Sequence, residues 1–172
     1  EEKRDIVSAT LKWKTPDMQL WYGCTGNNTA SSIKQVKHAS AEGADGVIVT
    51  VPSYVVPSEE ESVRFFLDVA DASTVPVGIY NNPTRVKTDL SAAAMIRIAE
   101  HPNIVLLKEA TSRGDQIARI AQARQHLSIM CCDSPNLGLV MQVMALGGQG
   151  TANMGGNIIP REMATISTPW RN

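Results

Sequence analysis

The fold is indicated most directly by residues 77–108, which read VGIYNNPTRVKTDLSAAAMIRIAEHPNIVLLK. The two apolar runs at 77–80 and 104–108 are typical of buried strands. Residues 91–100 between them have the spacing of an amphipathic helix, and Ser91 is a residue type that favours a helix start. Strand, helix and strand in this order predict one unit of a parallel sheet, because parallel neighbours need a crossover connection.

The same alternation continues in both directions along the chain. Further strands are expected at 18–22, 46–50, 127–131 and 150–154. Helices are expected at 1–12, 30–42 with Thr29 as N-cap, from 59 after Ser58, 114–125, 135–146 and from 160. Six strands, each followed by a helix or a helix start, predict a single α/β domain over residues 1–172. A doubly wound sheet and a β/α barrel both fit, and the lack of a Gly-x-Gly-x-x-Gly segment after the first strand disfavours the doubly wound sheet.

Composition narrows the class of protein. The chain is 43% hydrophobic and 19% charged, with a formal net charge of −1, as in an ordinary globular protein. Nucleic acid and anionic membranes are not expected as partners, because their binding proteins usually carry an excess of basic residues. No apolar run reaches the roughly 20 residues of a membrane span, and the first residues read as neither a signal nor a transit peptide.

The cysteines indicate the redox setting and argue against a metal. Cys24, Cys131 and Cys132 are odd in number and lack framework spacing, so reduced thiols in a cytoplasmic protein are expected. Cys131 and Cys132 would point to opposite faces of a strand, and the histidines have no ligand spacing towards them. We therefore expect no metal site.

Polar residues stand where the predicted strands end, which is where the chemistry of β/α barrels is placed. At these positions the sequence has Gly23-Cys24-Thr25, Thr50, Tyr80-Asn81, Lys108-Glu109, Cys132-Asp133 and Asn153. Glycines at 147, 148 and 150 and at 155 and 156 would either hold a phosphate or form tight turns.

Lys108 directly follows four apolar residues. A lysine that points into a core usually avoids the cost of a buried charge through a lowered pKa and a neutral amine. The neutral amine is the form that attacks a carbonyl to make a Schiff base. The alternatives are that the Lys108 side chain extends out of the strand end or pairs with Glu109.

Three other side chains have two interpretations each. Tyr80 would move protons near the Lys108 amine, or would cap the core with its hydroxyl bonded to a loop. Arg85 has a planar guanidinium suited to a carboxylate, or is an exposed loop residue. Tyr54 is either a site residue or a subunit contact.

Five segments together resemble the dihydrodipicolinate synthase / N-acetylneuraminate lyase family. Two of them look like its signature segments, Tyr80-Asn81-Asn82-Pro83-Thr84-Arg85 and Lys108-Glu109-Ala110-Thr111. The other three match in order and spacing: Gly23-Cys24-Thr25-Gly26-Asn27-Asn28-Thr29, Gly43-Ala44-Asp45-Gly46 and Ala145-Leu146-Gly147-Gly148. The resemblance runs from about residue 3 to residue 166.

The resemblance implies a (β/α)8 TIM barrel, usually a homotetramer, that condenses or cleaves pyruvate units without metal or organic cofactor. Lys108 would be the Schiff-base lysine and Tyr80 the proton-transferring tyrosine. Tyr54 would reach into a neighbouring subunit's site, and Arg85 would bind the carboxylate of a small aldehyde substrate. Ala152, Asn153 and Cys132 would also contact the substrate. Arg85 favours the synthase branch, which joins pyruvate to aspartate semialdehyde in lysine biosynthesis.

The sequence also departs from the family pattern. It lacks the first two β/α units and the C-terminal helices, so the barrel is expected to be partial. Cys132 replaces a small residue near the pyruvate carbonyl, which predicts a changed substrate preference. The alternatives are an aldolase for a 2-keto-3-deoxy sugar acid or 4-hydroxy-2-oxoglutarate, and a non-catalytic barrel fragment or binding paralogue.

Overall fold

The computed structural model describes residues 2–111, 113–132 and 138–169. Its strands are β1 (Trp21–Gly23), β2 (Gly46–Val49), β3 (Val77–Asn81), β4 (Ile104–Glu109), β5 (Ser128–Cys132) and β6 (Gly150–Ala152). They form one parallel sheet in the order β1-β2-β3-β4-β5-β6. Strands that follow one another without a reversal of order belong to the barrel type of α/β fold, because a doubly wound sheet reverses its order at a switch point. The sheet is a curled half-barrel.

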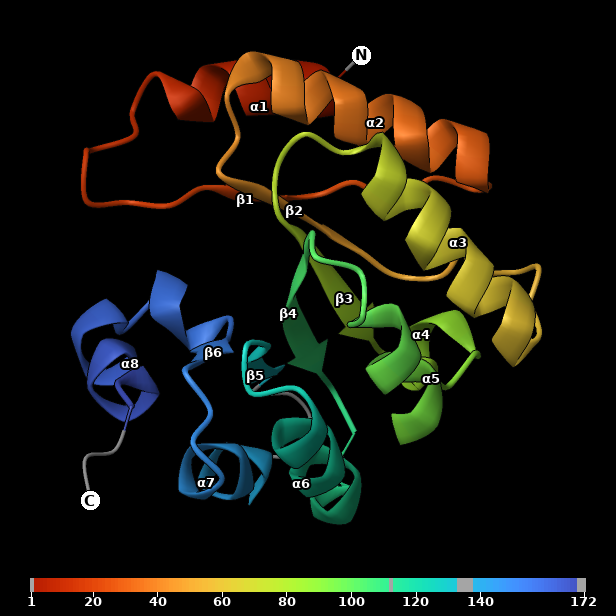
Figure 1. Ribbon diagram of the computed structural model, residues 1–172. Coiled ribbons are helices and arrows are strands. Elements are labelled where there is room, and N and C mark those ends of the chain that lie inside the picture. The colour runs from red at the N-terminus through yellow and green to blue at the C-terminus, as the bar shows by residue number, and fades with distance from the viewer. Residues whose placement is uncertain (1, 112, 133–137, 170–172) are drawn as a thin grey trace.

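The helices surround the sheet on its outer side (Figure 1). They are α1 (Glu2–Leu11), α2 (Thr29–Glu42), α3 (Glu59–Ala72), α4 (Pro83–Val86), α5 (Ala92–Ile98), α6 (Gly114–Ala123), α7 (Gly138–Ala145), the 3₁₀ helix η1 (Gly155–Asn157) and α8 (Pro160–Ser167). In the described part of the chain, no helix combines the length and apolarity that a membrane crossing requires.

Local signals account for several helix starts. Ser58 forms a capping box with Glu61 at the start of α3, and the Ser91 hydroxyl accepts from the Ala94 N–H at the start of α5. The predicted cap of α2 was wrong by one residue, because the Asn28 side chain accepts from the Ser31 N–H. The short helix α4 was not predicted.

Two strands, β1 and β6, are each two residues shorter than expected, and in each case a side chain accepts a hydrogen bond from the backbone. The Asp45 carboxylate accepts from the Leu20 N–H at 2.7 Å, and β1 begins only at Trp21. After β6, the Asn153 side chain accepts from the Gly156 N–H at 2.7 Å and turns the chain into η1. The expectation of strands at 18–22 and 150–154 is corrected accordingly.

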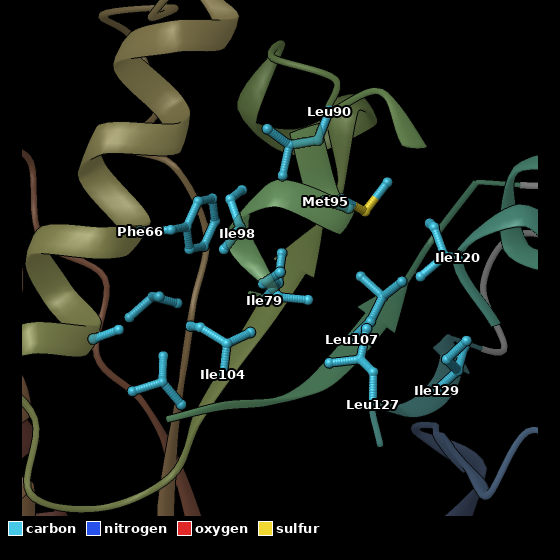
Figure 2. Close-up of a cluster of buried hydrophobic side chains, with 14 of the residues drawn as sticks. Phe66, Ile79, Leu90, Met95, Ile98, Ile104, Leu107, Ile120, Leu127 and Ile129 are labelled. Atoms are coloured by element: carbon cyan, nitrogen blue, oxygen red, sulfur yellow. The ribbon is translucent and has the colours of Figure 1, made fainter. Parts of the chain in front are cut away.

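The apolar core lies between the sheet and the helices. Figure 2 shows Phe66 of α3, Ile98 of α5 and Ile120 of α6 packed towards the strand residues Ile79 and Leu107, and all five are fully buried. Ile79 pairs in register with Leu107, and Leu107 with Ile129. Because side chains alternate along a strand, their neighbours Tyr80, Lys108 and Met130 point to the opposite, concave face. The core therefore fixes the strands whose other face carries the expected site.

Candidate active site

A pocket of about 370 Å³ lies at the carboxyl ends of β3 to β6. Its lining residues are Tyr80, Asn82, Arg85, Lys108, Cys132, Ala152, Asn153 and Met154. Parallel strands end on the same edge of the sheet, so residues far apart in sequence meet there. The structure thus brings together every expected site residue except Tyr54.

Lys108 and Tyr80 are cross-strand partners on β4 and β3. The Lys108 Nζ lies over the Tyr80 ring, 4.0 Å from its centroid. Lys108 is partly exposed, because the concave face of the half-barrel is open. The alternative pairing of Lys108 with Glu109 is wrong, since Glu109 points to the helix side and is fully buried there.

The Tyr80 hydroxyl has two hydrogen-bond partners in the pocket. Asn82 Nδ2 donates to Tyr80 Oη at 2.7 Å, and Cys132 Sγ donates to it at 3.4 Å. The bond to Asn82 also meets the alternative expectation of a hydroxyl held by a loop. Burial raises the pKa of Tyr80 to about 12, so the phenol keeps its proton at neutral pH.

Arg85 reaches the pocket from the last turn of α4. Pro83 is suited to the first turn of this helix, where its missing N–H costs nothing. Within the described residues the Arg85 guanidinium is exposed and forms no ion pair with a carboxylate. It is therefore available to an anionic group that enters the pocket.

The ends of β5 and β6 close the other side of the pocket. Cys131 and Cys132 point to opposite faces as predicted: Cys132 lines the pocket beside its register partner Ala152, and Cys131 lies in the hydrophobic core. Asn153 lines the pocket too, but its side chain also donates to Thr151 Oγ1 at 2.7 Å. Asp133 lies outside the described residues.

Tyr54 does not join the site within one chain. It lies in the loop after β2 with its side chain 97% exposed and does not line the pocket. Its φ of 76° and the φ of 43° at Val56 are unusual for residues other than glycine, and most of all for a β-branched valine. The loop therefore presents Tyr54 to its surroundings in a strained conformation.

A buried polar network on the helix side of β3 and β4 was missed from the sequence. The Glu109 carboxylate accepts from Asn81 Nδ2 at 3.2 Å and from the Ala110 and Thr111 N–H groups at 2.9 and 2.7 Å. Asn81 Oδ1 accepts from the Leu90 N–H at 3.2 Å. Burial raises the pKa of Glu109. The signal for this network was a polar residue directly after each of Tyr80 and Lys108.

The remaining strand-end residues do not line this pocket. Thr25 Oγ1 accepts from the Thr50 N–H at 2.9 Å and joins the ends of β1 and β2. Gly147 has a φ of 83°, the left-handed conformation that a tight turn requires. A larger cavity of about 880 Å³ lies between α1, α2 and β1; Gly23 and Cys24 line it, but none of the residues expected to contact the substrate does.

Comparison with known proteins identifies the family of the chain. The sequence profile of the Dihydrodipicolinate synthetase family matches residues 1–172. The 4-hydroxy-tetrahydrodipicolinate synthase of Gluconacetobacter diazotrophicus is 34% identical over 172 residues, which are 100% of this chain and 58% of that protein.

Two solved structures have the same fold. Dihydrodipicolinate synthase from Aquifex aeolicus superposes with a TM-score of 0.87 at 30% identity, over 95% of this chain and 56% of that one. The chloride-inhibited enzyme from Acinetobacter baumannii, complexed with pyruvate, gives 0.88 at 27% identity with the same coverage. The chain spans little more than half the length of these relatives, and it belongs to the dihydrodipicolinate synthetase family.

Proposed function

We propose that this chain carries the catalytic lysine and tyrosine of a 4-hydroxy-tetrahydrodipicolinate synthase, which joins pyruvate to aspartate semialdehyde in lysine biosynthesis. The observation that carries the proposal is the Lys108 amine held 4.0 Å from the Tyr80 ring in a pocket of about 370 Å³. This volume lies within the range of small-molecule sites. The names of the curated relatives support the choice of reaction.

The reaction begins with covalent capture of pyruvate. The Lys108 amine attacks the ketone carbon, and loss of water gives an imine. The methyl carbon then loses a proton, and the C–H electron pair becomes the double bond of an enamine. The enamine carbon attacks the aldehyde, whose oxygen takes up a proton. The iminium is the electron sink for these steps, so the proposed mechanism uses neither metal nor organic cofactor.

Five other pocket residues complete the proposed chemistry. Tyr80, whose pKa burial raises to about 12, gives its proton to the leaving hydroxyl and takes part in later transfers. Arg85, at the pocket edge, binds the carboxylate of the aldehyde through its planar guanidinium. Ala152, Asn153 and Cys132 contact the bound pyruvate unit, and Cys132 narrows the pocket where the family has a small residue.

We also propose that the six strands are part of an eight-stranded barrel. Within the described residues, β1 and β6 each pair with one strand, and open edges of this kind are normally covered in native proteins. The cavity beside β1 offers room for a further strand. The exposed Tyr54 would then serve a neighbouring subunit's site in a cytoplasmic homotetramer.

Turnover assays separate the proposed reaction from its rivals. Pyruvate with aspartate semialdehyde should give product, whereas 2-keto-3-deoxy sugar acids and 4-hydroxy-2-oxoglutarate should be cleaved poorly. The reverse preference would replace the synthase with a related aldolase. Borohydride added with pyruvate should inactivate the protein. A protein that survives this treatment unmodified would be a non-catalytic barrel.

A further inference from the structure

Residues 82–91, called the Arg85 segment below, connect β3 to α5 and bring Arg85 to the edge of the pocket. The segment contains α4, which has four residues, and so short a helix is not stable on its own hydrogen bonds. Near the other end of the segment, Leu90 belongs to the buried cluster of Figure 2 and is 2% exposed. The position of the Arg85 guanidinium therefore depends on the contacts that the segment makes with its neighbours.

Two buried side chains hold the backbone of Leu90 from both sides. Asn81 Oδ1 accepts from the Leu90 N–H at 3.2 Å, and Gln116 Nε2 donates to the Leu90 carbonyl at 3.2 Å. Asn81 is the last residue of β3, and Gln116 lies in the first turn of α6. The end of the Arg85 segment is therefore attached both to the sheet and to α6.

Asp89 adds an ionic contact one residue earlier. Its Oδ1 atom accepts from Arg113 Nη2 at 2.7 Å and from Asn81 Nδ2 at 3.1 Å. Arg113 is the N-cap residue of α6 and follows β4, the strand that carries Lys108. The ion pair therefore joins the Arg85 segment to the connection between β4 and α6.

The exposure of this ion pair indicates where its effect should be found. The side chains of Asp89 and Arg113 are 39% and 41% exposed. An exposed ion pair adds little to the stability of a whole domain, because water solvates both charges when they separate. It can still select one position of a short segment, since local opening costs less free energy than global unfolding. We therefore expect the pair to affect the position of Arg85 more than the stability of the fold.

We propose that Asp89 and Arg113 are positioning residues that attach the Arg85 segment to the start of α6 and so hold its guanidinium at the pocket. The catalytic consequence rests on the proposed function, in which Arg85 binds the carboxylate of the aldehyde substrate. The attachment itself does not depend on the reaction.

Asp89→Ala is the sharpest test, because charge and position predict opposite results. Asp89 is a negative charge on the segment that receives the substrate carboxylate, so by charge alone its removal should lower the KM for the semialdehyde. Loss of the attachment should instead raise this KM roughly two- to fivefold, the range expected for an exposed ion pair. The kcat and the KM for pyruvate should stay near the wild-type values, because Lys108 and Tyr80 are unchanged.

Arg113 provides the partner variants. Arg113→Ala should raise the same KM by a similar factor, and Asp89→Ala/Arg113→Ala should be no worse than either single change, because the two residues act through one contact. Arg113→Lys keeps the charge without the planar guanidinium and should restore the KM in part. The matched control is Asp68→Ala, which removes a 2.7 Å ion pair with Arg64 on α3, outside the pocket lining.

The attachment is measured without substrate by amide hydrogen exchange and mass spectrometry. In Asp89→Ala the amides of residues 82–91 should exchange roughly two- to fivefold faster, while peptides from β1 and β2 and the urea midpoint stay as in the wild type. Asp68→Ala should leave the exchange of residues 82–91 at the wild-type rate. Unchanged exchange of these residues in Asp89→Ala would overturn the proposal, whatever reaction the protein catalyses.

The kinetic result then tests the positioning role. Faster exchange with a KM for the semialdehyde that falls or stays constant would contradict it, and so would a urea midpoint that falls as far as the segment loosens. A wild-type protein that does not convert pyruvate and the semialdehyde would instead reject the proposed function, and the exchange rates would still decide the attachment.

Discussion

At the scale of single residues, the site follows from the alternation of side chains on two strands. Tyr80 and Lys108 share the concave face, and the residues directly after them, Asn81 and Glu109, bond to each other on the helix side. A shift of one residue in either strand would exchange these two faces. The positions of the amine and the phenol are therefore set by register as much as by residue type.

Tyr80→Phe keeps the ring that lies over the Lys108 amine and removes only the hydroxyl. We expect kcat to fall about 100-fold or more, in line with the loss of a general acid–base group. Steady-state turnover of pyruvate with aspartate semialdehyde measures this. Tyr22→Phe removes a hydroxyl that donates to the Val7 carbonyl outside the pocket and should leave kcat near the wild-type value. Equal losses in both variants would argue for a structural effect.

Arg85→Ala tests the proposed carboxylate contact. Loss of a charge-assisted hydrogen bond costs about 1.5–3 kcal/mol, so the KM for the semialdehyde should rise roughly tenfold to 100-fold. The KM for pyruvate should change little, because pyruvate is held by Lys108. Arg119→Ala, on the exposed face of α6, is the matched control. A rise confined to the pyruvate KM would assign Arg85 to the other substrate.

At the scale of elements, the ends of β3 and β4 are joined by the Glu109 network. The Glu109 carboxylate accepts hydrogen bonds from Asn81 Nδ2 and from the backbone N–H groups of Ala110 and Thr111. In Glu109→Gln one oxygen becomes an NH₂ group that faces those donors. We expect a loss of about 1–3 kcal/mol in the free energy of unfolding, measured by urea denaturation.

The buried Glu109 carboxyl is also expected to make the stability of the protein depend on pH. Burial raises the pKa of Glu109 above the ordinary glutamate value of 4.5, so the folded state holds this proton more tightly than the unfolded chain does. Its contribution to stability is then fully present below pH 4.5 and is lost as the pH rises through the folded pKa. The stability of the wild-type protein relative to Glu109→Gln should fall across that window. A relative stability that rises with pH would mean that the hydrogen bonds to the carboxylate outweigh its burial.

Local signals predicted the elements well where they act within the chain. The apolar runs at 77–80 and 104–108 gave β3 and β4 nearly to the residue, and Ser58 and Ser91 marked two helix starts. One error arose from a contact distant in sequence, because the Asp45 carboxylate accepts a hydrogen bond from the Leu20 N–H and the first strand begins only after it. The cap of α2 and the end of β6 depend on side chains that bond to the backbone three residues further on.

The sequence also predicted part of the candidate site. Lys108, Tyr80, Arg85 and Cys132 stood out because strand ends and motif segments are visible in sequence. Asn82 and the Glu109 network were not, because their roles depend on which strands become neighbours and which face each residue takes. Tyr54 was placed by the resemblance, and its role stays a prediction because its side chain points away from this chain's pocket.

At the scale of the whole molecule, the sheet is a half-barrel with two edges, β1 and β6. Joining the two N-terminal β/α units expected from the Gluconacetobacter relative ahead of Glu1 should cover β1, reduce aggregation beyond the proposed tetramer and raise the resistance of the chain to urea. Size-exclusion chromatography with light scattering and denaturation curves measure both. The control fusion carries prolines in the strand intended to pair with β1, which removes ladder donors. If both fusions behave alike, the barrel proposal is wrong.

The central claim is that pyruvate forms an imine with the amine that lies over the Tyr80 ring. Peptide mass mapping after borohydride reduction with pyruvate tests this most directly. We predict one reduced pyruvate adduct, located on Lys108, still present in Lys37→Arg at an exposed position of α2 and lost in Lys108→Arg. An adduct on another lysine, or one that persists in Lys108→Arg, would contradict the account.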